Sequence, residues 1–146
     1  MPTHGIRRRW SQRSNVLVYA TLNQDAAKKR VAASLIMEAV ASDSFCISSQ
    51  VLKEFANILI RKSNRLPPEI REDVRRFSRF VVVPDTPDLV LDALDLRRDY
   101  DLQFFDALIV AGAERADCDT IYSEDMADGA HYGRVTIVNP FKNQHP

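Results

Sequence analysis

The sequence predicts a three-layer α/β domain with a mostly parallel sheet. Short runs rich in β-branched and aromatic residues alternate with longer segments of helical periodicity, which is typical of strand–helix–strand units. The run FVVV at 80–83 is apolar at every position, as in strands that helices cover on both faces. With 146 residues, of which 45% are hydrophobic and 27% charged, the chain has the size and composition of one globular domain.

The overall charge and the cysteine pattern exclude some classes of protein. Lysine plus arginine balance aspartate plus glutamate at 20 each, so a nucleic-acid partner would have to use a local patch. No apolar run approaches the roughly 20 residues that span a bilayer, which argues against a membrane partner. Cys46 and Cys118 form no CxxC pair and fit reduced, buried thiols, so we expect a cytoplasmic protein.

The individual elements follow from local patterns along the chain. Apolar residues at helical spacing predict helices at 26–40, 50–62, 69–78, 87–98 and 104–113. Short β-rich runs predict strands at 45–48, 80–83, 120–123 and 135–138. Residues 16–19 have the β-branched content of a strand, but Ser14 is a plausible N-cap, so a short helix is also open there.

The helix at 104–113, FFDALIVAGA, has no polar face and is expected to be buried all round. Asp106 in its first turn contradicts that picture, because an isolated carboxylate in an apolar interior is costly. The positive end of the helix offsets only about 0.3–1 kcal/mol of this cost. Asp106 must therefore be protonated, paired or bound to a cation.

Two further acids are expected near Asp106. Asp125 follows the strand at 120–123, and Glu54 lies in the second turn of its helix, at the margin of the apolar stripe. Ligands of parallel sheets bind outside the carboxyl ends of the strands, where the three carboxylates can meet. A hard divalent cation such as Mg²⁺ or Mn²⁺ would relieve their repulsion and activate water against a phosphoryl group. The acids as a set thus indicate a phosphodiesterase.

Each acid also has an ordinary interpretation when it is taken alone. Asp106 is then a helix-dipole residue and Asp125 a turn residue. Glu54 is then a solvated residue with Lys53 and Arg61 nearby in the sequence. The combination of the three acids, and not any single one, carries the functional interpretation.

The order of these segments resembles the PIN domain, and in particular the VapC ribonuclease toxins of VapBC toxin–antitoxin pairs. SNVLVYA, SSQVLKEF, FFDALIVAGA and YSED resemble the first to fourth motifs of the family, and VTIVNPF resembles its last strand and tail. The similarity covers 14–141 and leaves 142–146 as a tail. It implies a three-layer α/β/α PIN-like domain with a mostly parallel sheet of four to five strands, and a short helix for SNVLVYA.

The resemblance also implies which residues form the site. Glu54, Asp106 and Asp125 match the second, third and fourth acids of the family and would be catalytic. Asp106 and Asp125 would hold one or two Mg²⁺ or Mn²⁺ ions. Asn15 and Ser123 match residues that support the acids. The implied partners are an RNA substrate, a cognate antitoxin and a second copy of the chain in a homodimer.

The segment 1–13 departs from the family pattern. The first acid of the family should directly precede SNVLVYA, but that position is Arg13. The first strand should be an apolar run in the middle of the sheet, whereas 1–13 contains four arginines and no acid. Such a segment is costly to bury, so we expect it to be poorly ordered or loosely paired and the metal site to be weakened. Because the departure is one block with a sharp edge, a frameshift or a wrongly chosen start is our hypothesis for it.

Two classes of function follow. The first is a Mg²⁺- or Mn²⁺-dependent endoribonuclease of the toxin type, in which Glu54 positions or deprotonates the attacking water. The second is a PIN-like pseudo-nuclease, an antitoxin-binding or regulatory module in which Arg13 replaces the metal as counter-charge to the acids. The segment 61–79, with seven basic residues against three acidic ones, either tracks an RNA backbone or is a solvated helix pair or a dimer contact.

Overall fold

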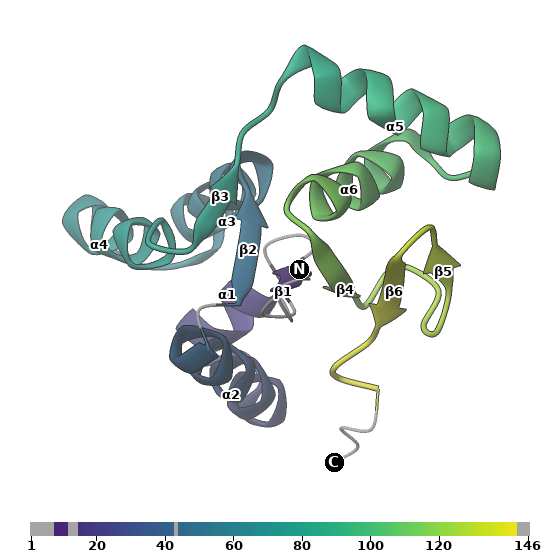
Figure 1. Ribbon diagram of the computed structural model, residues 1–146. Helices are drawn as coiled ribbons and strands as arrows, with labels where there is room; N and C mark the ends of the chain where they lie inside the picture. The colour runs from purple at the N-terminus through teal and green to yellow at the C-terminus, as the bar shows by residue number, and fades with distance from the viewer. Residues whose placement is uncertain (1–7, 12–14, 43, 143–146) are drawn as a thin grey trace.

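The computed structural model describes residues 8–11, 15–42 and 44–142 (Figure 1). In this part of the chain the helices are α1 (Asn15–Thr21), α2 (Ala26–Ser42), α3 (Ser49–Lys62), α4 (Pro67–Phe77), α5 (Pro87–Tyr100) and α6 (Phe104–Arg115). The strands are β1 (Arg8–Ser11), β2 (Phe45–Ser48), β3 (Val81–Val83), β4 (Cys118–Tyr122), β5 (His131–Tyr132) and β6 (Val135–Val138). None of the described helices is long and apolar enough to cross a membrane.

The strands form one six-stranded sheet in the order β3-β2-β1-β4-β6-β5. β1 pairs in parallel with β2 and with β4, and the β2–β3 and β4–β6 pairs are parallel as well. The two-residue β5 pairs antiparallel with β6, across a tight turn that begins at Gly133 with a φ of 61°. This confirms the predicted α/β class with a mostly parallel sheet, and β5 makes the sheet one strand larger than expected.

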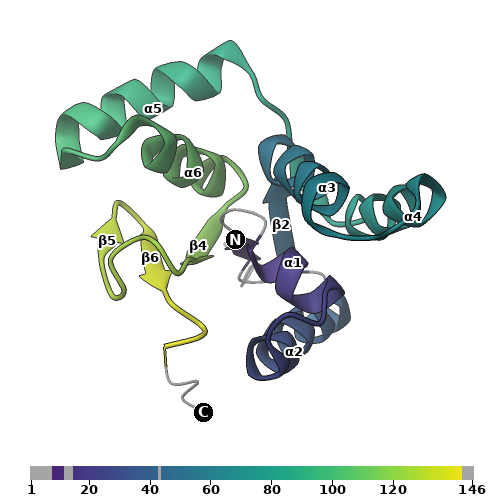
Figure 2. The same cartoon turned by 180° about the vertical axis from the view of Figure 1, so that it is seen from behind.

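Helices cover both faces of the sheet, so the core has two parts (Figures 1 and 2). α5 and α6 lie over one face, where Cys46 and Ile121 are buried. α1, α2, α3 and α4 lie over the other, where Phe45, Ile47 and Phe55 are buried. Neighbouring residues of β2 belong to different core parts because side chains alternate between the two faces of a strand. Both core parts are therefore built on the same few central strands.

The structure corrects our expectation for residues 8–11 of the N-terminal segment, and the rest of 1–13 lies outside the described residues. Arg8–Ser11 forms β1 in the middle of the sheet, with Trp10 in register with Cys46 of β2 and Ile121 of β4. Residues 8–11 are therefore paired on both sides and are not the loosely attached segment that their composition predicted. The physical reason is that a strand between two parallel neighbours is held by backbone hydrogen bonds, which any side chain allows.

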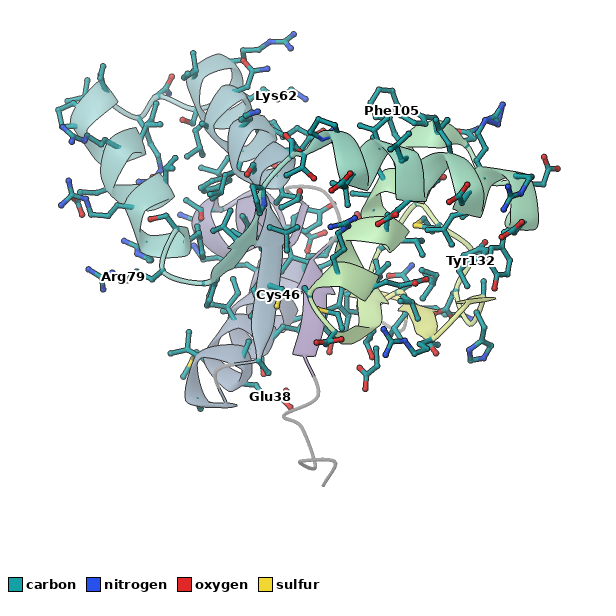
Figure 3. All side chains as sticks on the ribbon, turned by 45° about the horizontal axis from the view of Figure 1, so that its top comes forward. Glu38, Cys46, Lys62, Arg79, Phe105 and Tyr132 are labelled. Carbon is teal, nitrogen blue, oxygen red and sulfur yellow. The ribbon has the colours of Figure 1, made fainter. Side chains whose placement is uncertain are left out.

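Two other expectations about burial are wrong. The run at 80–83 was expected to be a strand buried on both faces, but β3 is an edge strand and Val82 and Val83 are half-buried. The helix α6 was expected to be buried all round, but Phe105 is 63% exposed and projects outward at the start of the helix (Figure 3). Most of the rest of α6 is buried as predicted, namely Ala107 and the run from Ile109 to Ala113, while Leu108 is half-buried.

Candidate active site

Glu54 is placed by the way in which α3 begins. Ser48 ends β2 and caps α3, because its Oγ accepts a hydrogen bond from Val51 N at 3.1 Å. The helix therefore starts directly at the carboxyl end of the strand. Glu54 follows in the second turn and is half-buried at the margin of the apolar face, as its spacing predicts. Gln50 Nε2 donates a hydrogen bond to Glu54 Oε1 at 3.2 Å.

Asp106 lies in the first turn of α6, at the opposite end from Glu114. Glu114, near the end of α6, lies close to Gly133 in the turn before β6. The two are so close that a Cβ atom at Gly133 would lie only 2.8 Å from Glu114 Oε1. That turn is at the amino end of β6, which is parallel to β4, so the first turn of α6 points toward the carboxyl ends of these strands.

The surroundings of Asp106 differ from the apolar interior that the sequence predicted. Asp106 is half-buried, and its side chain makes no hydrogen bond or ion pair with any described residue. Its carboxylate therefore needs no buried counter-charge of the kind that full burial would demand. It is stabilised instead by its place at the positive end of α6.

Ser123 shapes the loop that carries Asp125. Ser123 is 4% exposed, and its Oγ accepts hydrogen bonds from Asp125 N at 3.1 Å and Met126 N at 2.9 Å. Its own backbone N donates to Val138 O at 3.0 Å, which fixes the start of the loop against β6. Asp125 is exposed at the carboxyl end of β4.

The three acids thus come from three separate elements that begin or end at the carboxyl edge of the sheet. Carboxylate oxygens are the ligands that Mg²⁺ and Mn²⁺ prefer, so the donor types fit a hard divalent ion. Within the described ranges, however, no group of three His, Cys, Asp or Glu side chains is arranged to hold one metal ion. Like-charged carboxylates repel one another unless a cation lies between them, which opposes closer approach.

Two residues of the predicted site cannot be placed at this edge. Arg13 lies outside the described residues. Asn15 opens α1, and its side chain is also outside the described part of the structure. The candidate site residues that the structure does describe are Glu54, Asp106, Asp125 and Ser123.

A second polar cluster lies next to Asp125 and was not singled out by the sequence patterns. Glu124 Oε1 accepts a hydrogen bond from Lys28 Nζ at 2.6 Å, and Glu124 Oε2 accepts one from the Tyr19 hydroxyl at 3.1 Å. The hydrogen bond to Glu124 raises the pKa of Lys28, and burial raises the pKa of Tyr19. The sequence carries one signal for this cluster, because Lys28 shares a helix face with the apolar Ala32 and Leu35.

Fold and site together define a class of protein: a three-layer α/β domain whose central parallel sheet presents carboxylates at its carboxyl edge. Within this class, the sequence profile of the PIN domain matches residues 14–127, and the chain belongs to the PIN domain family. No curated protein sequence matches the chain significantly.

Several solved structures share this fold at low sequence identity. A toxin–antitoxin complex from Klebsiella pneumoniae is 17% identical with a TM-score of 0.63, over 91% of this chain and 97% of that one. The sarcin–ricin loop cleaving toxin VapC20 from Mycobacterium tuberculosis is 20% identical with a TM-score of 0.59, over 80% and 89%. VapBC2 from Rickettsia felis, bound to a DNA fragment from its promoter, is 15% identical with a TM-score of 0.62, over 88% and 96%.

Proposed function

We propose that this chain is a divalent-metal-dependent endoribonuclease and the toxin component of a toxin–antitoxin system. The observation that carries the proposal is that Glu54, Asp106 and Asp125 belong to, or directly follow, three different elements that begin or end at the carboxyl edge of the sheet. Membership of the PIN domain family and the likeness of the fold to VapC structures support it.

The roles that we propose follow from the position of each acid. Asp106 and Asp125 hold Mg²⁺ or Mn²⁺, Asp106 from the start of α6 and Asp125 from the loop that Ser123 shapes. Glu54 positions or deprotonates the attacking water. When bound, the ion supplies an activated water and stabilises charge on the phosphoryl group.

The partners that we propose are an RNA substrate, an antitoxin protein and a second copy of the chain. Solved structures of similar fold include complexes of a toxin with its antitoxin. Large apolar side chains are exposed on α5 and at the start of α6 and are available for a protein contact: Val90, Leu91, Leu94 and Phe105. Because the net charge of the chain is zero, RNA would bind to a local basic surface, for which the segment 61–79 is the candidate.

A second candidate function is that of a pseudo-nuclease that binds an antitoxin without cleaving RNA. One observation favours it. Arg13 stands where the first acid of the family is expected, and a guanidinium cannot coordinate a cation.

An RNA cleavage assay with Mn²⁺ or Mg²⁺ tests the proposal on the unaltered chain and on Asp106→Asn, Asp88→Asn and Arg13→Asp. Asp88 is the matched control, because it is the acid in the first turn of α5, as Asp106 is in α6. We expect Asp106→Asn to abolish cleavage while its melting temperature is unchanged or higher, since removing one carboxylate relieves repulsion. Asp88→Asn should cleave normally.

The outcomes separate the two functions. Cleavage by the unaltered chain that Asp106→Asn abolishes supports the nuclease. Cleavage that appears only in Arg13→Asp supports the pseudo-nuclease, because the other acids would then be placed for catalysis and only Arg13 would prevent it. A chain that cleaves no RNA even as Arg13→Asp contradicts the nuclease proposal.

A further inference from the structure

The carboxylate of Glu124, next to Asp125 in the chain, is held by two helices. Lys28 of α2 donates to Glu124 Oε1 at 2.6 Å, and Tyr19 of α1 donates to Glu124 Oε2 at 3.1 Å. Lys28 Nζ also donates to the Tyr19 hydroxyl at 3.3 Å, so the three polar groups contact one another in a closed triangle. Each group therefore restricts the position of the other two.

The ammonium group of Lys28 is enclosed by aromatic rings as well. Lys28 Nζ lies 4.9 Å from the ring centre of Tyr19 and 5.7 Å from that of Phe141. These two rings pack edge to face with their centres 5.1 Å apart. The side chain of Lys28 is only 29% exposed and that of Glu124 only 19%. Lys28 thus joins α2, α1, the segment after β6 and the loop after β4.

The peptide unit that carries Asp125 is consequently fixed from two sides. On one side, Ser123 Oγ accepts hydrogen bonds from Asp125 N and Met126 N. On the other, the Glu124 carboxylate is anchored to Lys28 and Tyr19. A backbone rotation at Asp125 would strain the bonds to Ser123 Oγ, and a shift of Glu124 would strain the bonds of its carboxylate.

The net energy of the ion pair does not explain this arrangement. The partial desolvation of Lys28 and Glu124 offsets much of their attraction, so such pairs add little to stability. Their clearest physical effect is to select one geometry among several, and here that geometry belongs to the loop that presents Asp125.

We propose that Lys28 is a positioning residue, which through Glu124 and Tyr19 sets the loop that carries Asp125. The inference rests on the proposed function, because it assigns Asp125 to the site. Lys28 is not a catalytic residue, since its ammonium group is committed to Glu124. Its loss should therefore lower the rate of the chemical step and leave RNA binding unchanged.

Lys28→Met, Lys28→Arg and the control Lys29→Met test the proposal in the full chain. Lys29 is the next residue on α2 and contacts Asn23 at the surface, so Lys29→Met removes the same charge without touching the cluster. We expect Lys28→Met to lower kcat by about tenfold to a hundredfold at unchanged KM, as misplaced catalytic groups do. Lys28→Arg should restore most of kcat, and Lys29→Met should match the unaltered chain.

A second measurement does not depend on activity. The amide protons of Asp125 and Met126, which donate to Ser123 Oγ, should exchange faster with solvent in Lys28→Met than in Lys29→Met, as NMR can detect residue by residue. Unchanged protection in Lys28→Met overturns the proposal. A raised KM with weaker salt dependence also overturns it, because Lys28 would then contact RNA directly.

The two proposals fail in different ways. If the unaltered chain and Arg13→Asp cleave no RNA, the proposed function fails, and amide exchange alone then decides whether Lys28 sets the loop. If the unaltered chain cleaves RNA and Lys28→Met does so at the same kcat, the positioning role fails and the nuclease stands.

Discussion

The N-cap of α3 links the stability of the fold to the position of Glu54. Ser48→Ala removes the Oγ that accepts a hydrogen bond from Val51 N at 3.1 Å. Ser48 is 7% exposed, so water cannot replace the lost partner and a buried N–H is left unsatisfied. Losing an N-cap lowers the free energy of unfolding by about 0.5–2 kcal/mol. Because the unsatisfied N–H is buried, we expect the upper part of this range for Ser48→Ala, about 1.5–2 kcal/mol. At about 4 °C per kcal/mol for a chain of this length, the melting temperature should fall by about 6–8 °C.

Thr86→Ala is the matched control. Thr86 caps α5 in the same manner, because its Oγ1 accepts a hydrogen bond from Leu89 N at 3.2 Å. Thr86 is half-buried, so water replaces part of the lost bond and the cost should be about 0.5–1 kcal/mol, or about 2–4 °C. α5 carries none of the three acids. Thermal unfolding and RNA cleavage are then measured on both variants well below their melting temperatures.

We expect only Ser48→Ala to lose cleavage activity beyond its loss of folded protein, because only α3 positions Glu54. Two results would refute this reasoning. One is a Ser48→Ala protein that melts like the unaltered chain, which would mean that the cap bond is not a significant contact. The other is an equal loss of activity in Thr86→Ala, which would trace the loss to general instability.

Two further predictions concern charged groups. Arg65 Nη1 lies 3.0 Å from Asp73 Oδ2, without the geometry of a hydrogen bond. The Asp73 side chain is only 4% exposed, and Arg76 Nη1, which also pairs with it, lies 3.9 Å from Asp73 Oδ1. Arg65→Met should therefore lower the free energy of unfolding, measured in urea, by about 3 kcal/mol. The double variant Arg65→Met, Asp73→Asn should recover part of this loss. If it recovers none, the buried charge of Asp73 is not the cause. Asn139 N and Lys142 Nζ bind Asp128 at 2.8 and 3.0 Å and lower its pKa below the usual 3.8. The stabilisation by Asp128 is thus present above pH 3.8 and is lost as the pH falls through the lowered pKa. Asp128→Asn should therefore melt at a lower temperature than the unaltered chain at neutral pH, and at the same temperature in strong acid. A difference in melting temperature that does not depend on pH would contradict this prediction.

Local patterns predicted most elements of the fold. The apolar stripe of Val51, Phe55 and Leu59 predicted α3 and its buried face, and the structure confirms it. Helical spacing likewise predicted α2 and α5, whose observed ends differ from the predicted ones by only a few residues. These signals work because a helix or a strand buries one face, which is encoded within a short window of sequence.

Features that depend on distant parts of the chain were not predicted. β1 is a strand because β2 and β4 lie on either side of it. The family resemblance implied a middle strand there, but the arginine-rich sequence itself predicted a loosely paired segment. The exposure of Phe105 depends on how α5 and α6 pack, which the sequence of α6 does not contain. Lys28 and Glu124 are 96 positions apart, and the contact of their side chains requires the fold to be complete.

The position of β1 bears on how the two candidate functions differ. Ser11 is in register with Tyr122, and α1 begins at Asn15, so the fold fixes the chain on both sides of position 13. Contacts between described residues hold the elements that carry Glu54, Asp106 and Asp125. Because the resemblance assigns position 13 to the first acid of the family, we expect Arg13→Asp to change the charge there and to leave these contacts in place. Millimolar Mn²⁺ should therefore raise the melting temperature of Arg13→Asp, because an ion at a hundredfold excess over its Kd stabilises the folded state by about 2.7 kcal/mol. The melting temperature of the unaltered chain should rise much less.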